Sequence, residues 1–138
     1  MENSHETILT LSFIIKNIKL DFDEISDRLK LQPTKIVRNG ESLSKVVEES
    51  QNDIWIYEVK SKENSNTNAI FEKLLNDISP SIDNIKLLSG LHSIYLRLYV
   101  QSDYAQIRMD ISKNVIQKLS DLNIRLEISV LSWGGVDD

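Results

Sequence analysis

Tyrosine and arginine alternate along one apolar segment of this sequence, and that pattern is the most suggestive of contact with another molecule. Tyr95, Arg97 and Tyr99 stand two residues apart, and Arg125 and Glu127 repeat this spacing near the C-terminus. Because successive side chains of a β-strand point to opposite faces, each set would share one face of its strand. Aromatic and arginine side chains are enriched at protein–protein interfaces. We therefore predict that these five residues form a partner-binding surface.

The same five residues also fit a surface without a partner. Such side chains can simply cover a solvated sheet, where each cross-strand pair contributes about 0.2–1 kcal/mol. In RNA-binding sheets, aromatic side chains stack on bases. This chain, however, carries 21 acidic and 16 basic residues, for a net charge of −5, and nucleic-acid binding needs concentrated positive charge. We predict no nucleic-acid partner and keep protein contact and plain surface as alternatives.

Residues that could catalyse a reaction or bind a metal are scarce. The chain has no cysteine and two histidines, His5 and His92, neither of which has partners at metal-ligand spacing. We interpret both as structural or surface residues. The four glycines give neither a phosphate-binding loop nor a Gly-x-Ser-x-Gly turn. The sequence therefore predicts no catalytic residues, no metal site and no cofactor.

Clustered carboxylates have two interpretations. Asp21, Asp23 and Glu24, or Glu48 and Glu49, could hold a hard cation. The first group equally marks the start of a helix, where Asp21 would cap free amides and the carboxylates would favour the helix dipole. The second group lacks the glycine turn and alternating oxygen ligands of a cation-binding loop. We favour a helix start and a solvated loop.

Apolar periodicity predicts the elements that position these residues. Alternation predicts strands over 7–16, 53–60, 92–101 and 124–131, with a short strand over 35–38. Helical spacing predicts one helix that begins at Asp21 and ends before Pro33, and others over 69–78 and 112–122. The segment 82–88 fits either structure, and whether 41–53 is ordered stays open.

One side of each long strand is apolar and is expected to face the core. The expected core residues are Leu9, Leu11, Phe13 and Ile15, then Trp55, Tyr57 and Val59, then Ile94, Leu96, Leu98 and Val100, then Ile124, Leu126, Ile128 and Val130. Trp55 and Tyr57 could instead stack on a ligand, but we favour a core role. The other face of the first strand mixes hydroxyls with Ile8 and Ile14 and is expected to be partly solvated.

Strands with one polar face favour an antiparallel sheet covered on one side. We predict a single α+β domain over residues 1–138, of the ferredoxin-like two-layer type. Its sheet would be largely antiparallel, with helices on one face and with an extra helix and strand. Residues 1–6 and 134–138 are expected to be flexible.

The expected location is the cytoplasm. The N-terminal segment has two acids and no basic region, and no run approaches the roughly 18 consecutive apolar residues of a membrane helix. A chain without cysteine suits a reducing compartment. We expect no contact with a membrane.

Short motifs spread over nearly the whole chain suggest a family. The segment 29–34 (LKLQPT) is followed by Gly40 and by Trp55 in a strand, and later by Leu74-Leu75 and by the segment 119–124 (LSDLNI). Together these motifs resemble an uncharacterised bacterial family, domain of unknown function 4279. The resemblance implies a small stand-alone bacterial protein and brings no assigned functional residues.

Our leading hypothesis is a non-enzymatic binding or interaction module. One form is an immunity-type protein, in which an acidic chain neutralises a basic toxin and opposite charges speed association. The alternative is a small-molecule-sensing homodimer with its ligand at a sheet or dimer interface. A hydrolase that uses the acidic clusters ranks third, because no nucleophile, base and orienting group converge.

Overall fold

The computed structural model describes residues 7–41, 51–61, 66–103 and 107–132. Its elements are, in chain order, β1 (Thr7–Asn17), α1 (Phe22–Leu29), β2 (Lys35–Val37), β3 (Asp53–Ser61), α2 (Thr67–Ile78), the 3-10 helix η1 (Ser79–Ser81), α3 (Ile82–Ser89), β4 (Ser93–Ser102), α4 (Lys113–Leu122) and β5 (Arg125–Ser132). Every expected strand and helix is present, and the ambiguous segment 82–88 is helical. Residues 42–50 and the chain ends expected to be flexible, 1–6 and 134–138, lie outside the described residues.

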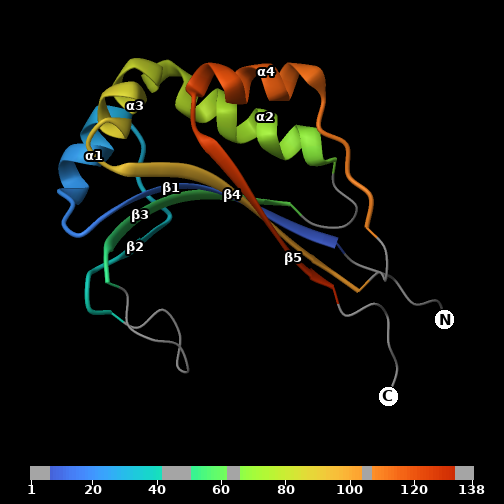
Figure 1. Ribbon diagram of the computed structural model, residues 1–138, viewed down its shortest axis with the longest axis horizontal. Helices are drawn as coiled ribbons and strands as arrows, with labels where there is room; N and C mark the ends of the chain where they lie inside the picture. Colours follow the sequence, from blue (N-terminus) through green and yellow to red (C-terminus); the bar gives the residue numbers. More distant parts are fainter. Residues whose placement is uncertain (1–6, 42–50, 62–65, 104–106, 133–138) are drawn as a thin grey trace.

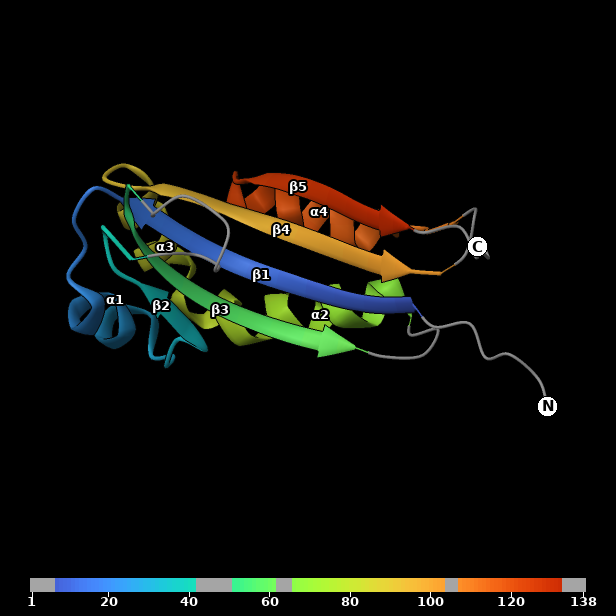
Figure 2. The same cartoon turned by 90° about the horizontal axis from the view of Figure 1, so that it is seen from below.

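The strands form one mixed sheet in the order β2-β3-β1-β4-β5 (Figure 2). Antiparallel pairing joins β2 to β3, β3 to β1 and β1 to β4. The last pair, β4 and β5, is parallel. A parallel pair needs a crossover connection, and α4 supplies it. The predicted α+β class and largely antiparallel sheet are confirmed.

The helices lie on one face of the sheet, as predicted (Figure 1). Between the two layers is a core of fully buried side chains, which includes Leu11, Phe13, Trp55, Phe71, Leu74, Ile78, Ile85, Leu96 and Leu98. Burying one such side chain contributes about 1.5–3 kcal/mol. The apolar strand face and the apolar helix stripes therefore fix which side of the sheet the helices cover.

Side-chain caps set where the helices begin. The Ser112 hydroxyl accepts a hydrogen bond from the Val115 amide at 3.2 Å, and α4 begins at Lys113, directly after Ser112. Helix α2 begins at Thr67, two residues before the predicted start, because the Asn66 side chain accepts from the Asn68 amide at 2.8 Å. A capped helix satisfies amides that its own backbone cannot.

The side of β1 that faces away from the helices is only partly solvated, as expected. Ile14, opposite Tyr95, is buried, whereas Ile8 and Thr10 are half-buried. One expectation about the strands needs correction. Ile128 and Val130 share the helix-covered face with Leu98 and Val100, yet they are 50 % and 51 % exposed. They stay exposed because β5 is the last strand of the sheet formed by the described residues.

Candidate partner-binding surface

Strand alternation and register bring the five predicted surface residues together on the sheet face opposite the helices, which we call the outer face. Tyr95, Arg97 and Tyr99 lie along β4. In the parallel pairing of β4 with β5, Arg125 lies beside Tyr95, and Glu127 lies beside Arg97. No helix of the described residues covers this face (Figure 1).

Tyr95 is not available for contact, although it lies on the outer face. Its side chain is only 3 % exposed. The Arg125 guanidinium carbon lies 4.2 Å from the ring centroid, and Arg97 Cζ and Lys16 Nζ each lie 5.7 Å away. Long basic side chains bury their stems on apolar surface, and their charges are attracted to the aromatic face. Tyr95 is therefore buried within the surface predicted to bind a partner, whereas Tyr99 is half-buried.

Glu127 links the two arginines. Its carboxylate accepts from Arg97 Nε at 3.0 Å and from Arg125 Nη2 at 3.1 Å. The hydrogen bond from Arg97 lowers the pKa of Glu127 most. Burial opposes this effect in part, and the bond from Arg125 lowers the pKa further. All three side chains are more than a third exposed. Such pairs contribute about 0–1 kcal/mol to stability, so the network holds the arginines in place more than it stabilises the fold.

The outer face is basic in a chain that is acidic overall. Register places five basic and two acidic strand residues on it: Lys16, Lys35, Lys60, Arg97 and Arg125, with Glu58 and Glu127. The surplus of three positive charges contrasts with the net charge of −5. Within the described part of the chain, Lys16, Lys35 and Lys60 have no carboxylate at ion-pair distance. These charges are therefore available to a partner.

Sequence reasoning missed the three lysines of this face. Lys16 stands two residues after Ile14 in the first expected strand, so alternation alone places it on the outer side. Its position over Tyr95 depends on the antiparallel pairing of β1 with β4, which the sequence does not reveal. The signal available from sequence was the parity of basic residues along each strand.

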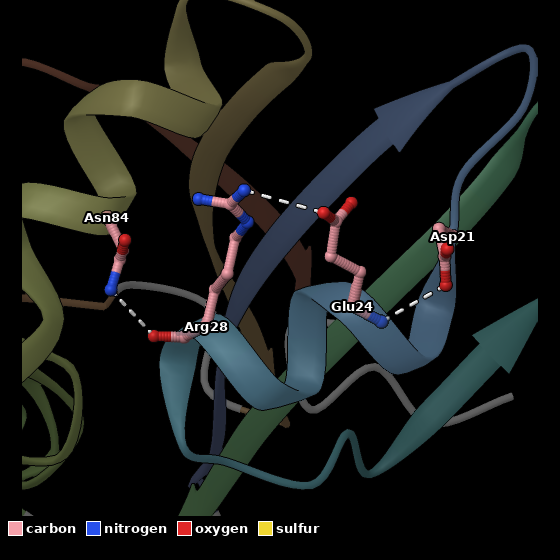
Figure 3. A network of polar contacts seen from close by, with 4 residues as sticks. All are labelled: Asp21, Glu24, Arg28 and Asn84. Atoms are coloured by element: carbon pink, nitrogen blue, oxygen red, sulfur yellow. Dashed lines mark hydrogen bonds and ion pairs between the residues drawn. The ribbon is translucent and has the colours of Figure 1, made fainter.

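The acidic cluster of α1 starts the helix, as favoured from the sequence. Asp21 Oδ1 accepts from the Glu24 amide at 3.1 Å, and the Glu24 carboxylate lies 3.4 Å from Arg28 (Figure 3). Asn84 of α3 donates to the Arg28 carbonyl at 2.9 Å and holds the end of α1 (Figure 3). Glu48 and Glu49 lie outside the described residues. Among those described, no three histidine or acidic side chains gather as metal ligands.

His92 has a structural contact. Asn17 Nδ2 lies 2.9 Å from His92 Nδ1 and donates to the Leu91 carbonyl at 3.2 Å. These contacts tie the end of β1 to the turn before β4, in keeping with the structural interpretation of His92. His5 lies outside the described residues.

Trp55 and Tyr57 anchor the helical layer. Trp55 is fully buried and donates from Nε1 to the Ser26 hydroxyl at 3.1 Å. Tyr57 donates to Asp77 Oδ2 at 2.7 Å, and this bond raises the pKa of Tyr57. Burial raises the pKa of Asp77, but bonds from Lys73 and Tyr57 outweigh it and keep the pKa low. The core role favoured from the sequence is confirmed for Trp55.

Comparison with known proteins supports the resemblance noted in the sequence. No curated protein and no solved structure matches the chain. No helix formed by the described residues is long and apolar enough to cross a membrane. A family model matches residues 5–133, which is nearly the whole chain, and the chain therefore belongs to the family described as Domain of unknown function (DUF4279).

Proposed function

We propose that this protein is a non-enzymatic binding module and that its outer face contacts a protein with an acidic surface. One observation carries the proposal: five basic and two acidic strand residues share a face that no described helix covers. Opposite charges on two surfaces steer encounter and reject partners of like charge. An acidic partner would therefore be selected by this face and not by the chain as a whole.

The packing around Tyr95 prepares the basic residues for contact. Arg125 lies over the ring at 4.2 Å and is also held by Glu127 at 3.1 Å. A side chain that is already ordered loses less conformational freedom when it binds. Arginine in such a position can bond a carboxylate through two parallel N–H groups. Arg125 and Arg97 are thus the residues we expect at the centre of the contact.

The arrangement of the strands supports a ferredoxin-like core for the module. The segment from β1 to β4 runs strand, helix, strand, strand, helices, strand, and its strands lie in the order β2-β3-β1-β4 with antiparallel pairing. In this layout β3 separates β1 from β2, as in a split βαβ unit. The pair α4 and β5 would then be the added helix and strand.

The immunity-type role stays a prediction, and exposed acidic residues would supply the charge that it needs. Asp21, Asp23, Glu24 and Asp27 are exposed in and beside α1, a helix of the layer that covers the other side of the sheet (Figure 1). A basic toxin would meet these residues, whereas an acidic one would meet the outer face. The small-molecule-sensing alternative also stays a prediction.

Charge reversal on the outer face tests the proposal. The double variant Lys16→Glu/Arg125→Glu is compared with Lys86→Glu/Lys113→Glu, which makes the same charge change at exposed residues of α3 and α4. Each is used to capture proteins from a lysate of the source organism, after circular dichroism has shown that it is folded. We expect the outer-face variant to lose at least about tenfold of an acidic protein that the control retains.

Two results would overturn the proposal. Equal capture by both variants would show that the outer face is not the contact surface. Loss of the captured material after nuclease treatment would replace a protein partner with a nucleic acid.

A further inference from the structure

Among the strands that the structure describes, β5 is a long edge strand without the usual protection. It spans eight residues, Arg125–Ser132, whereas the opposite edge strand β2 spans three, Lys35–Val37. Exposed edges are usually shortened, or carry lysine or proline, because their free backbone groups attract other strands. Strand β5 contains neither lysine nor proline. Its backbone is therefore suited to pair with another strand.

Large apolar side chains are exposed along this edge. Ile128 and Val130 on the helix-covered face are 50 % and 51 % exposed, and Leu131 on the outer face is 47 % exposed. Ile116 of α4 is 54 % exposed. On α4, Lys118 and Asp121 line a hollow toward α2 and α3. Ile116 lies two residues before Lys118, so it points about 160° away around the helix axis, toward the β5 side.

We propose that β5 pairs antiparallel with β5 of a second copy of this chain, about a two-fold axis perpendicular to the sheet. Such an axis keeps the helix-covered faces of both copies on one side, so apolar residues meet apolar residues. In the register centred on Ser129, Ile128 of each copy lies opposite Val130 of the other. The apolar half of β5 is therefore complementary to itself.

The charges of β5 disfavour one competing register and leave the C-terminal half of the strand uncharged. Only Arg125 and Glu127 are charged, and they bond each other at 3.1 Å. A register centred on Glu127 would set two carboxylates opposite each other, which is unfavourable. Centring on Ser129 instead places Glu127 opposite Leu131 of the other copy, about four residues or 13 Å from the second Glu127. Residues 128–132 carry no charge that would select an acidic or basic partner.

The resulting dimer would have one continuous sheet with all helices on one side. Ile116 of each copy would then lie over the junction beside Ile128 and Val130. Two outer faces would also join into one surface, but the inference depends only on the β5 edge and not on the proposed function of that face.

Sedimentation and light scattering test the dimer. The unmodified protein is expected to have the mass of two copies, and Val130→Lys is expected to weaken the dimer at least about tenfold, because it places a charge in the apolar junction. Leu87→Lys introduces the same charge at an exposed leucine of α3 and should leave the dimer intact. A monomer at the highest soluble concentration, or equal weakening by both variants, would overturn the proposal.

A single cysteine tests the register, because the chain has none of its own. Residues directly opposite in an antiparallel pair have Cβ atoms about 4.5–5.5 Å apart, close enough for a disulfide after small adjustment. Ser129→Cys should therefore form a covalent dimer under mild oxidation at least about tenfold faster than Ser89→Cys, an exposed serine at the end of α3. Equal rates would contradict pairing centred on Ser129, and this conservative variant does not depend on the folding of Val130→Lys.

Discussion

The two faces of the sheet bury aromatic side chains by different means. On the helix-covered face, Trp55 packs edge-on against Phe13, with ring centroids 6.2 Å apart, and bonds Ser26 of α1. On the outer face, Tyr95 is almost as completely buried, but beneath the side chains of Lys16, Arg97 and Arg125. Among the described residues, basic side chains lie over this ring where a helix would lie on the other face.

The difference has consequences for stability and for contact. Packed helices move too little to fill the space that a smaller side chain leaves, so truncating a side chain beneath them leaves a cavity. Lysine and arginine side chains are flexible and keep their charged ends in water. The cover of Tyr95 can therefore collapse onto a smaller residue, and it presents charge to a partner while it excludes water from the ring.

The largest effect is expected from Trp55→Ala. This change removes a fully buried ring and leaves the Ser26 hydroxyl without its donor. We expect a loss of about 3–5 kcal/mol in the free energy of unfolding, measured by urea denaturation. A loss no larger than about 1–3 kcal/mol would mean that the helical layer rearranges as readily as the basic side chains do.

A smaller effect is expected from Tyr95→Ala. Because its cover can rearrange, we expect a loss of about 1–3 kcal/mol in the same measurement. The control is Tyr95→Phe, which keeps a ring beneath the three cations and should change stability by less than about 1 kcal/mol. If Tyr95→Ala cost as much as Trp55→Ala, the proposed difference between the two faces would be wrong.

The smallest effect is expected from Glu127→Gln, which should cost at most about 1 kcal/mol at neutral pH. Arg97 and Arg125 lower the pKa of Glu127 in the folded protein, so its ionised form stabilises the fold above the ordinary glutamate pKa. That contribution is lost as pH falls through the lowered value. Denaturation across an acidic pH series should show the difference between the two proteins shrinking. A difference that stays constant through this range would exclude the carboxylate as its source.

The outer face was predictable only in part. Alternation is a property of neighbouring residues, so the sequence places Tyr95, Arg97 and Tyr99 on one side of β4. It likewise places Arg125 and Glu127 together on one side of β5. Burial of Tyr95 depends on Lys16 and Ile14 of β1, which the chain pairs with β4 across a long sequence separation. No local pattern contains that information.

The half-exposed Ile128 and Val130 make the same point. Their alternation correctly indicates the helix-covered face, but alternation is equal for a central strand and an edge strand. Only the strand order, in which β5 is last among the described strands, leaves these two side chains without a neighbouring strand on one side.

The sequence by itself indicated the long strands, the helices begun by Asp21 and Ser112 and the apolar side of each element, because each depends on residues within a few positions of one another. It left open the structure of the segment 82–88, which is helical. Asp21 and Ser112 cap the helices that follow them, and the alternation around Phe13 is typical of a strand. The tertiary structure alone decided which strands are neighbours, which basic side chains cover Tyr95 and which strand is left at the edge. Those outcomes depend on pairing between distant segments, where the free energy of the whole sheet and its helical layer selects one arrangement.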